Sequence, residues 1–253
     1  MARWLSDLRT VGAFLTILPV GPRIDDRAAL TRGDLAAASW CFPVIGLIVG
    51  GLAGLAYALA AWLGFNPWLA ATLCVTVLVL LCGAMHEDGL GDFADGMGGT
   101  SRERRLAIMR DSQAGNFALV ALLLLFAARI GALAAIAAPG AVIAALVTAA
   151  VVSRTAMVVV MYFLPSARED GLGADAGRPG GDITLAAIGV AAVIALVNVG
   201  FLNGLYSLAG AAVGAGAVAM VARRRLGGQT GDVLGAVQIV AELSCLLLLS
   251  LTN

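Results

Sequence analysis

Seven apolar runs, each close to the length that crosses a lipid bilayer, constrain the fold of this chain more than any other feature. A membrane-spanning helix needs about 20 consecutive, mostly apolar residues. The chain of 253 residues is 60% hydrophobic and only 13% charged, about half the charge of an ordinary soluble domain. We therefore predict an all-α, polytopic membrane helix bundle that forms a single domain over 1–253. The runs lie near 41–63, 68–85, 115–138, 140–164, 183–201, 204–222 and 234–252.

Short junctions and small residues predict tight packing within this bundle. Ala138-Pro139-Gly140 and Leu202-Asn203-Gly204 leave room only for tight turns. The 32 glycines favour close helix contacts. The four cysteines stand singly in apolar stretches, so we expect packing residues and neither disulfides nor metal ligands; they are Cys41, Cys74, Cys82 and Cys245.

The basic residues, all of them arginines, fall on one side of the predicted bundle. If the runs alternate in direction, the N-terminal segment of about 1–40 shares one face with the loops after the second, fourth and sixth runs. The positive-inside rule assigns that face to the cytoplasm. We predict a multi-pass protein of the bacterial cytoplasmic (inner) membrane with a cytoplasmic N-terminus. The arginines are Arg3, Arg9, Arg23, Arg27, Arg32, Arg102, Arg104, Arg105, Arg110, Arg168, Arg178, Arg223, Arg224 and Arg225.

Nearly all acidic residues fall on the same face, which leaves the other face with almost no ionisable groups. A transporter needs polar groups along a route through the membrane, so this distribution favours an enzyme with a cytoplasmic active site. The formal net charge is zero, which predicts no nucleic-acid partner. Within the runs stand Arg129, Arg154 and Glu242, for which function and structural pairing, such as Arg154 with Glu242, both stay open.

Four carboxylates and the single histidine stand within the stretch 86–95, the start of an acidic loop over about 86–113. If the second run continues as a helix, Asp88, Asp92 and Asp95 share one stripe at i, i+4 and i+7, and Glu87 lies one residue to the side. Unneutralised, such a row repels itself. Oxygen ligands of this kind suit Mg²⁺ or Mn²⁺, and the spacing predicts metal binding.

Glycines at 89, 91, 96, 98 and 99 interrupt this acidic stretch. They weaken a helix by up to about 1 kcal/mol each, which predicts close approach of another helix or of a substrate phosphate. An acidic, solvated helix end is the plainer alternative. His86 is expected at the membrane boundary as a hydrogen-bonding side chain, a general base or a ligand, and we do not make it the catalytic centre.

Three further polar islands lie on the same face. Arg110-Asp111-Ser112 ends an arginine-rich amphipathic helix that meets either lipid headgroups or phosphate. The second island, 165–173, carries Arg168 and Asp170. The third, 227–232, is glycine-rich and ends in Asp232 at the start of the last run, so it is either an anion cradle or a plain turn with a helix cap. Together the islands suggest phosphoryl or nucleotidyl transfer.

Five short stretches, in order along nearly the whole chain, resemble a known family. They are FLTILPV at 14–20, EDG at 87–89 with Asp92 and with DG at 95–96, RDS at 110–112, AREDGLG at 167–173, and GQTGD at 228–232. These stretches resemble the cobalamin 5′-phosphate synthases, the adenosylcobinamide-GDP ribazoletransferases. The chain departs from the pattern at Asn116, where the family is expected to have threonine, which weakens a ligand role for that position.

The resemblance implies a Mg²⁺-dependent membrane enzyme late in vitamin B12 assembly. It implies joining adenosylcobinamide-GDP to α-ribazole or its 5′-phosphate with release of GMP; the oligomeric state, a homo-oligomer included, stays open. The ribazole hydroxyl would attack the phosphorus attached to cobinamide. The implied metal ligands are Glu87, Asp88, Asp92, Asp95 and Asp111, the catalytic residues are Asp92, Asp95 and Asp232, and the substrate-binding residues are Arg110, Arg168, Asp170, Gly228, Thr230 and Gly231.

Two other functions remain alternatives. Asp92-Phe93-Ala94-Asp95-Gly96 satisfies the first half of the CDP-alcohol phosphotransferase signature, but no GxxxDxxxD follows to complete it. A cation or metabolite transporter would use the acidic stripe as a binding site, and the nearly uncharged opposite face disfavours it.

Overall fold

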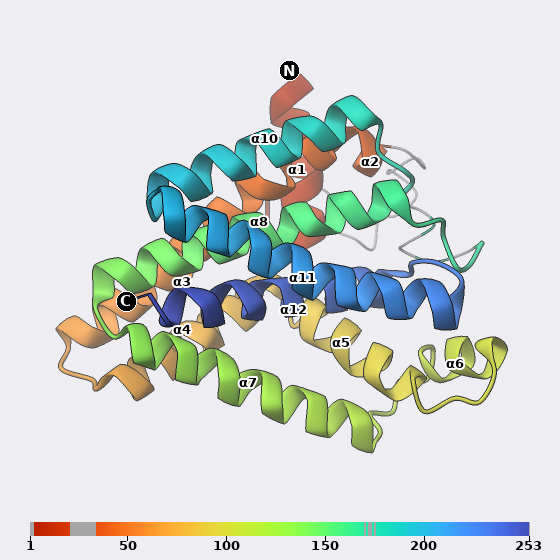
Figure 1. Cartoon of the computed structure of the whole chain (residues 1–253), viewed down its shortest axis with the longest axis horizontal. Coiled ribbons are helices and arrows are strands. Elements are labelled where there is room, and N and C mark those ends of the chain that lie inside the picture. The colour runs from red at the N-terminus through yellow and green to blue at the C-terminus, as the bar shows by residue number, and fades with distance from the viewer. Residues whose placement is uncertain (1–2, 21–33, 170, 172–173, 175, 253) are drawn as a thin grey trace.

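The computed structural model describes residues 3–20, 34–169, 171, 174 and 176–252, and all regular elements in these ranges are helices. Each predicted apolar run corresponds to a helix, so the expected all-α bundle is confirmed (Figure 1). The helices are α1 (Arg3–Leu15), α2 (Asp34–Ala38), α3 (Phe42–Trp62), α4 (Pro67–Cys82), α5 (Met85–Gly96), α6 (Arg102–Ile108), α7 (Asn116–Ile136), α8 (Pro139–Phe163), α10 (Gly181–Asn198), α11 (Phe201–Leu226) and α12 (Gly231–Ser250).

The lengths and compositions of these helices are those of a multi-pass membrane protein. Six helical segments of the described chain are long and apolar enough to cross a bilayer, and α4 with α5 makes a seventh if the bent pair counts as one span. Within the bundle α8 is the central helix, packed against α3, α10, α11 and α12. The four cysteines are buried and unpaired, as expected.

The second span is broken, which corrects the expectation of a continuous helix into the acidic stretch. The axes of α4 and α5 differ by 88°. Gly83 ends α4 in the left-handed region at φ 61°, and Ala84 follows at φ 56°, a conformation that only glycine adopts readily. A Cβ on Gly83 would lie 2.8 Å from Ile17 Cγ2. Because the chain turns here, the acidic residues occupy a helix of their own.

The two tight turns have different outcomes. The first is confirmed, since α8 begins at Pro139 directly after α7. The second was placed three residues too late. Gly200, at φ 82°, makes the turn between α10 and α11, and Gly204 lies inside α11, where a Cβ would come within 2.9 Å of Leu196 Cα.

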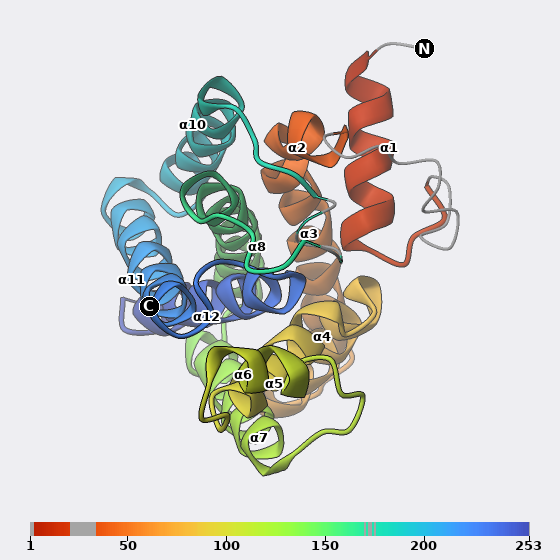
Figure 2. The same cartoon turned by 90° about the vertical axis from the view of Figure 1, so that its right-hand side faces the viewer.

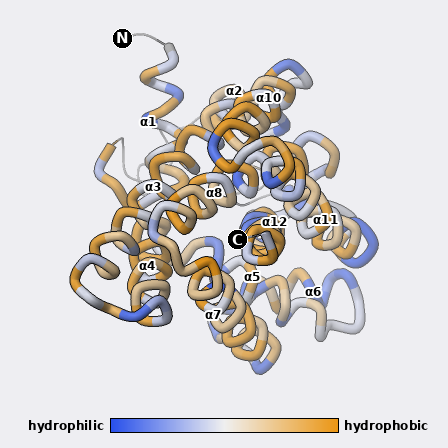
Figure 3. Tube along the Cα trace, turned by 60° about the vertical axis from the view of Figure 1, so that its left-hand side comes forward, coloured by the Kyte–Doolittle hydropathy of each residue, from blue (hydrophilic) through white to orange (hydrophobic). Residues whose placement is uncertain are grey.

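The polar loops gather at one end of the bundle. The loops before α7, after α8 and before α12 all lie at the right-hand end of Figure 1, and Figure 2 looks onto this end, with α5, α6 and α12 foremost. Hydrophilic residues concentrate on α6 and at the end of α11, while the spans are largely hydrophobic (Figure 3). The polar loops and the arginines of α6 and α11 match the predicted polar face, but α1, which carries Arg3 and Arg9, lies near the middle of the long axis in Figure 1. Arg23, Arg27 and Arg32 lie outside the described residues.

Candidate active site

The acidic helix α5 is held against α12 by direct contact between their backbones. A Cβ on Gly89 would lie 2.9 Å from the carbonyl oxygen of Asp232 and 3.2 Å from Gly235 Cα. On its other side α5 meets α7, where a Cβ on Gly91 would lie 3.3 Å from Ala118 Cβ. The glycines therefore serve close helix approach, which was one of the two predicted reasons for them.

We expect Gly89→Ala to push α5 away from α12, because the added Cβ meets backbone atoms that cannot move aside. The expected destabilisation is about 1–3 kcal/mol, as for other overpacked sites, with a fall in activity. Gly131→Ala in α7 is the matched control, since its Cβ would meet nothing within 4 Å and alanine favours the helix. Thermal unfolding in one detergent measures both; equal stability of the two variants would contradict this packing.

Three carboxylates lie near one another where α5 and α12 meet. Asp88 is exposed, and Asp92 and Asp232 are partly buried. The charges of Asp88, Asp232 and Asp95 all act on the carboxylate of Asp92. Among the described residues, Asp88 and Asp92 accept no side-chain hydrogen bond and form no ion pair. This excess of negative charge favours a bound cation.

Among the described residues, Arg168 is the arginine that forms an ion pair with this group. Its Nη1 lies 3.7 Å from Asp232 Oδ2, and its Nη2 donates to the carbonyl of Leu106 at 2.9 Å. Thr230 is the N-cap of α12: its Oγ1 accepts from the N–H of Val233 and donates to Asp232 Oδ2. The guanidinium and the first turn of α12 thus lie on the same side of the carboxylates, where a phosphate would be stabilised.

Two loops far apart in the sequence are joined by backbone hydrogen bonds close to Arg168. The N–H of Gln229 donates to the carbonyl of Pro165, and the N–H of Ala167 donates to that of Gln229, both at 2.8 Å. A Cβ on Gly228 would overlap the carbonyl oxygen of Pro165. The glycine-rich island and the island with Arg168 therefore form one unit. Asp170 lies outside the described residues.

Arg102 connects this unit to α6 through hydrogen bonds, and the sequence did not predict this contact. Its Nε and Nη2 donate to the carbonyls of Leu226 and Ala167, both at 2.7 Å. We had expected the arginines of this helix to meet lipid or phosphate; Arg102 instead contacts backbone of the protein. No signal in the sequence distinguishes Arg102 from its arginine neighbours.

Asp95 accepts hydrogen bonds from the backbone at the start of α7, a contact that a metal ligand would not need. Its two oxygens accept the backbone N–H groups of Gly115 at 2.6 Å and Ala118 at 2.9 Å, so it caps the start of α7. Asp111, exposed after α6, accepts the N–H of Gln113 at 3.1 Å. Arg110 is also exposed, and its implied role in substrate binding stays a prediction.

Glu87 points away from the other carboxylates into a buried charge network. Its Oε1 accepts from Arg129 Nη1 at 2.9 Å, and Arg129 Nη2 donates to Glu242. Arg154 Nη1 lies 3.8 Å from Glu242 Oε2, which also accepts from Gln238. All four charged side chains are buried. The expected Arg154–Glu242 pair is present, and Arg129 already neutralises Glu87, which does not support a ligand role for Glu87.

His86 is buried within the protein, and its predicted place at the membrane boundary stays a prediction. It is 1% exposed, and neither ring nitrogen has a hydrogen-bond partner among the described residues. It lines a cavity of about 80 Å³ together with Asp88 and Asp232. The cavity has mostly apolar walls and a few polar groups, and its size leaves room for a few water molecules or for one small group of a ligand.

The carboxylates offer oxygen ligands but no complete metal cage. Among the described residues, no group of three or more acidic, histidine or cysteine side chains is placed to hold a metal ion. Mg²⁺ is commonly bound by one or two carboxylates together with substrate phosphates. Asp88 and Asp92 fit that mode, since burial and the charges of Asp88, Asp232 and Asp95 raise the pKa of Asp92 to about 7, which a bound cation would lower.

Comparison with known proteins gives full-length matches. The family model described as cobalamin-5-phosphate synthase matches residues 7–250. A Bradyrhizobium diazoefficiens protein named adenosylcobinamide-GDP ribazoletransferase is 42% identical over 96% of this chain and 92% of its own. Proteins of the same name from Azorhizobium caulinodans and Escherichia coli are 41% and 38% identical, covering 97% and 94% of this chain and 96% of each relative. No solved structure matches the chain.

Proposed function

The chain belongs to the cobalamin-5-phosphate synthase family and is an adenosylcobinamide-GDP ribazoletransferase; from this premise we propose how its residues perform the transfer. The substrates are adenosylcobinamide-GDP and α-ribazole or its 5′-phosphate. The observation that carries the proposal is the meeting of Asp88, Asp92 and Asp232 beside Arg168 at the polar end of the bundle. This is where an anionic donor would need both a cation and an arginine.

We propose that Mg²⁺ binds with the pyrophosphate of the donor, held by the carboxylates of Asp88 and Asp92, which leaves Asp232 free to act as a base. Such a cation would neutralise the pyrophosphate and the departing phosphate of GMP. The absence of a three-ligand cluster among the described side chains is consistent with a cation that arrives with its phosphates. We propose no ligand role for Glu87 or Asp95, because each already has strong partners.

We propose that residues of the protein itself carry out the remaining steps. Arg168 and the backbone of 228–231 bind phosphate oxygens. The ribazole hydroxyl attacks the phosphorus attached to cobinamide, the bond from that phosphorus to the bridging oxygen breaks, and GMP leaves with that oxygen. Asp232 accepts the hydroxyl proton. Thr230 donates a hydrogen bond to the same carboxylate, which fixes its orientation. Ligand roles for Arg110, Asp111 and Asp170 stay predictions.

We also propose that the polar end faces the cytoplasm. The arginine-rich helix α6 and the last turn of α11, which carries three arginines, both lie at that end, as the positive-inside rule requires. An active site on that side would open to the compartment where nucleotide substrates are made.

Turnover in proteoliposomes tests the reaction and its metal together. Purified full-length protein is supplied with adenosylcobinamide-GDP, α-ribazole 5′-phosphate and Mg²⁺, and GMP and the joined corrinoid are followed by mass spectrometry. We expect both products in equal amounts and a loss of at least about 10²-fold in EDTA, since a bound cation contributes several kcal/mol to such transfers. Undiminished turnover in EDTA would exclude the metal, and no product from folded protein would exclude the function.

A further inference from the structure

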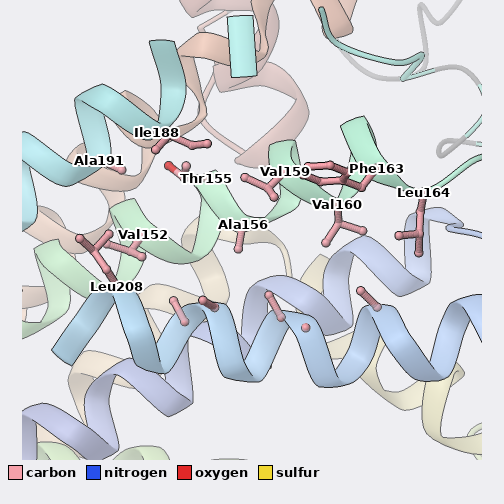
Figure 4. A pocket seen from close by; sticks show the side chains of 15 residues that line it. Val152, Thr155, Ala156, Val159, Val160, Phe163, Leu164, Ile188, Ala191 and Leu208 are labelled. Carbon is pink, nitrogen blue, oxygen red and sulfur yellow. The ribbon is translucent and has the colours of Figure 1, made fainter. Parts of the chain in front are cut away.

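A long groove runs between α8, α10 and α11, separate from the carboxylates (Figure 4). Its volume is about 360 Å³. Small residues of α11 line one wall, and larger apolar side chains of α8 line the other. The lining includes Val152, Thr155, Ala156, Val159, Leu164 and Ala215.

The lining selects for hydrocarbon. Thr155 is the one polar side chain among these described lining residues, and its Oγ1 already donates to the carbonyl of Val151 at 3.0 Å. A polar group placed in the groove would lose its hydrogen bonds to water without replacement, which costs several kcal/mol. The amides of a corrinoid, a ribose or a phosphate therefore do not fit, and the groove is not a second substrate site.

The length of the groove matches one leaflet of a bilayer. Along α8 it extends from Val152 to Leu164, which at 1.5 Å per residue is about 18 Å. Half the hydrocarbon core of a bilayer is about 15 Å. Leu164 lies directly after α8, at the polar end of the bundle, so the groove spans the leaflet on the side of the active site.

An arginine and a tyrosine lie beside the polar end of the groove without lining it, and we call this pair its cationic mouth. Arg178 Nε donates to the carbonyl of Tyr162 at 2.8 Å, and its guanidinium lies 5.4 Å from the centre of the Tyr162 ring. The next residue, Phe163, lines the groove. Tyrosine and arginine at this level are the residues that contact lipid headgroups, and the guanidinium suits a phosphate.

We propose that the groove binds one acyl chain of an anionic phospholipid from the leaflet on the active-site side, with its headgroup at Arg178. Hydrocarbon lining, one-leaflet length and a cationic mouth together specify this occupant. The lipid would fill space between α8, α10 and α11 and pack against Leu164, which precedes the loop that carries Arg168. This inference does not depend on the proposed reaction.

The test uses the full-length protein in nanodiscs containing phosphatidylglycerol with a photoactivatable acyl chain. After irradiation, labelled residues are mapped by mass spectrometry. We expect labels concentrated on Ala156, Val159 and Ala215 over Val193 and Val213, which are 63% and 72% exposed on the outer faces of α10 and α11. Labelling of the groove no stronger than at Val193 and Val213 would mean annular lipid contact only and would overturn the proposal.

Ala156→Leu tests the site of the acyl chain, and Arg178→Ala tests the site of the headgroup. Ala156→Leu fills the groove and is expected to remove the concentrated labels, while Val193→Leu, its lipid-facing control, keeps them; melting temperatures verify that both fold. Arg178→Ala is expected to lower labelling by phosphatidylglycerol roughly fivefold, the effect of one cation at a membrane surface, and to leave labelling by a phosphatidylcholine probe unchanged. Unchanged labelling in Ala156→Leu, or an equal fall for both lipids in Arg178→Ala, would contradict the proposal.

Discussion

Asp92→Asn is expected to lower turnover by roughly 10³-fold, because it removes a charge from the group proposed to hold Mg²⁺ and the pyrophosphate. Metal stabilisation of a transferring phosphoryl group contributes several kcal/mol, and each 1.36 kcal/mol is a factor of ten in rate. The substitution keeps the shape of the side chain. The rate of GMP release in proteoliposomes measures the effect at saturating Mg²⁺.

The folded state of this variant should be at least as stable as that of the original protein. Asp88, Asp95 and Asp232 all act on the charge of Asp92, and a neutral amide relieves their repulsion. We therefore expect an unchanged or higher melting temperature together with the lost activity. Glu103→Gln, on exposed α6, is the matched control and should leave turnover unchanged; its melting temperature should fall only slightly, because Glu103 accepts hydrogen bonds in the first turn of α6. Near-normal turnover in Asp92→Asn would remove the basis of the proposed site.

Arg129→Met is expected to destabilise the protein by roughly 3–5 kcal/mol, as breaking a buried ion pair from one side does. The substitution leaves Glu87 buried without its partner and leaves Glu242 with Gln238 and, at 3.8 Å, with Arg154. Because Glu87 begins the acidic helix, α5 should lose its position and activity should fall with stability. The free energy of unfolding in a fixed detergent measures the first effect.

The double variant Glu87→Gln/Arg129→Met distinguishes a neutralised pair from a metal ligand. It leaves one buried glutamate and one buried arginine, so we expect it to be about 1–3 kcal/mol more stable than Arg129→Met, the range of coupling energies between contacting residues. Its half-saturating Mg²⁺ concentration should stay near that of the original protein. A large rise in the half-saturating Mg²⁺ concentration would indicate that Glu87 is a metal ligand. A double variant no more stable than Arg129→Met would contradict the pairing of Glu87 with Arg129.

The spans and their order could be predicted because length and apolarity suffice for a membrane helix. The break at Gly83 and Ala84 could not be predicted from the sequence. The apolar run ends there without a proline, and a single glycine permits a turn but does not require one. The turn at Gly200 was misplaced for a related reason. Leu202-Asn203-Gly204 has turn composition, yet Gly204 serves the contact with Leu196.

Helical periodicity correctly placed Asp88, Asp92 and Asp95 on one helix, and the family was recognisable from its motifs. Their partners were not predictable, because side-chain contacts depend on how distant helices pack. Glu87 differs from Asp88 by one position, yet it forms a buried ion pair with Arg129, 42 residues away. Likewise Asp95 caps a helix that begins 21 residues later. The alternatives of a CDP-alcohol phosphotransferase and a transporter are set aside by the family match over 7–250.

Binding of Mn²⁺, a spectroscopic substitute for Mg²⁺, tests the central claim most directly. Electron paramagnetic resonance would follow free Mn²⁺ added to the purified protein in nanodiscs with GDP present as the diphosphate. We predict one class of bound Mn²⁺ that requires GDP, is lost in Asp92→Asn, and persists in Glu87→Gln/Arg129→Met. Equal Mn²⁺ binding by Asp92→Asn and the original protein would contradict the assignment of the carboxylates where α5 meets α12.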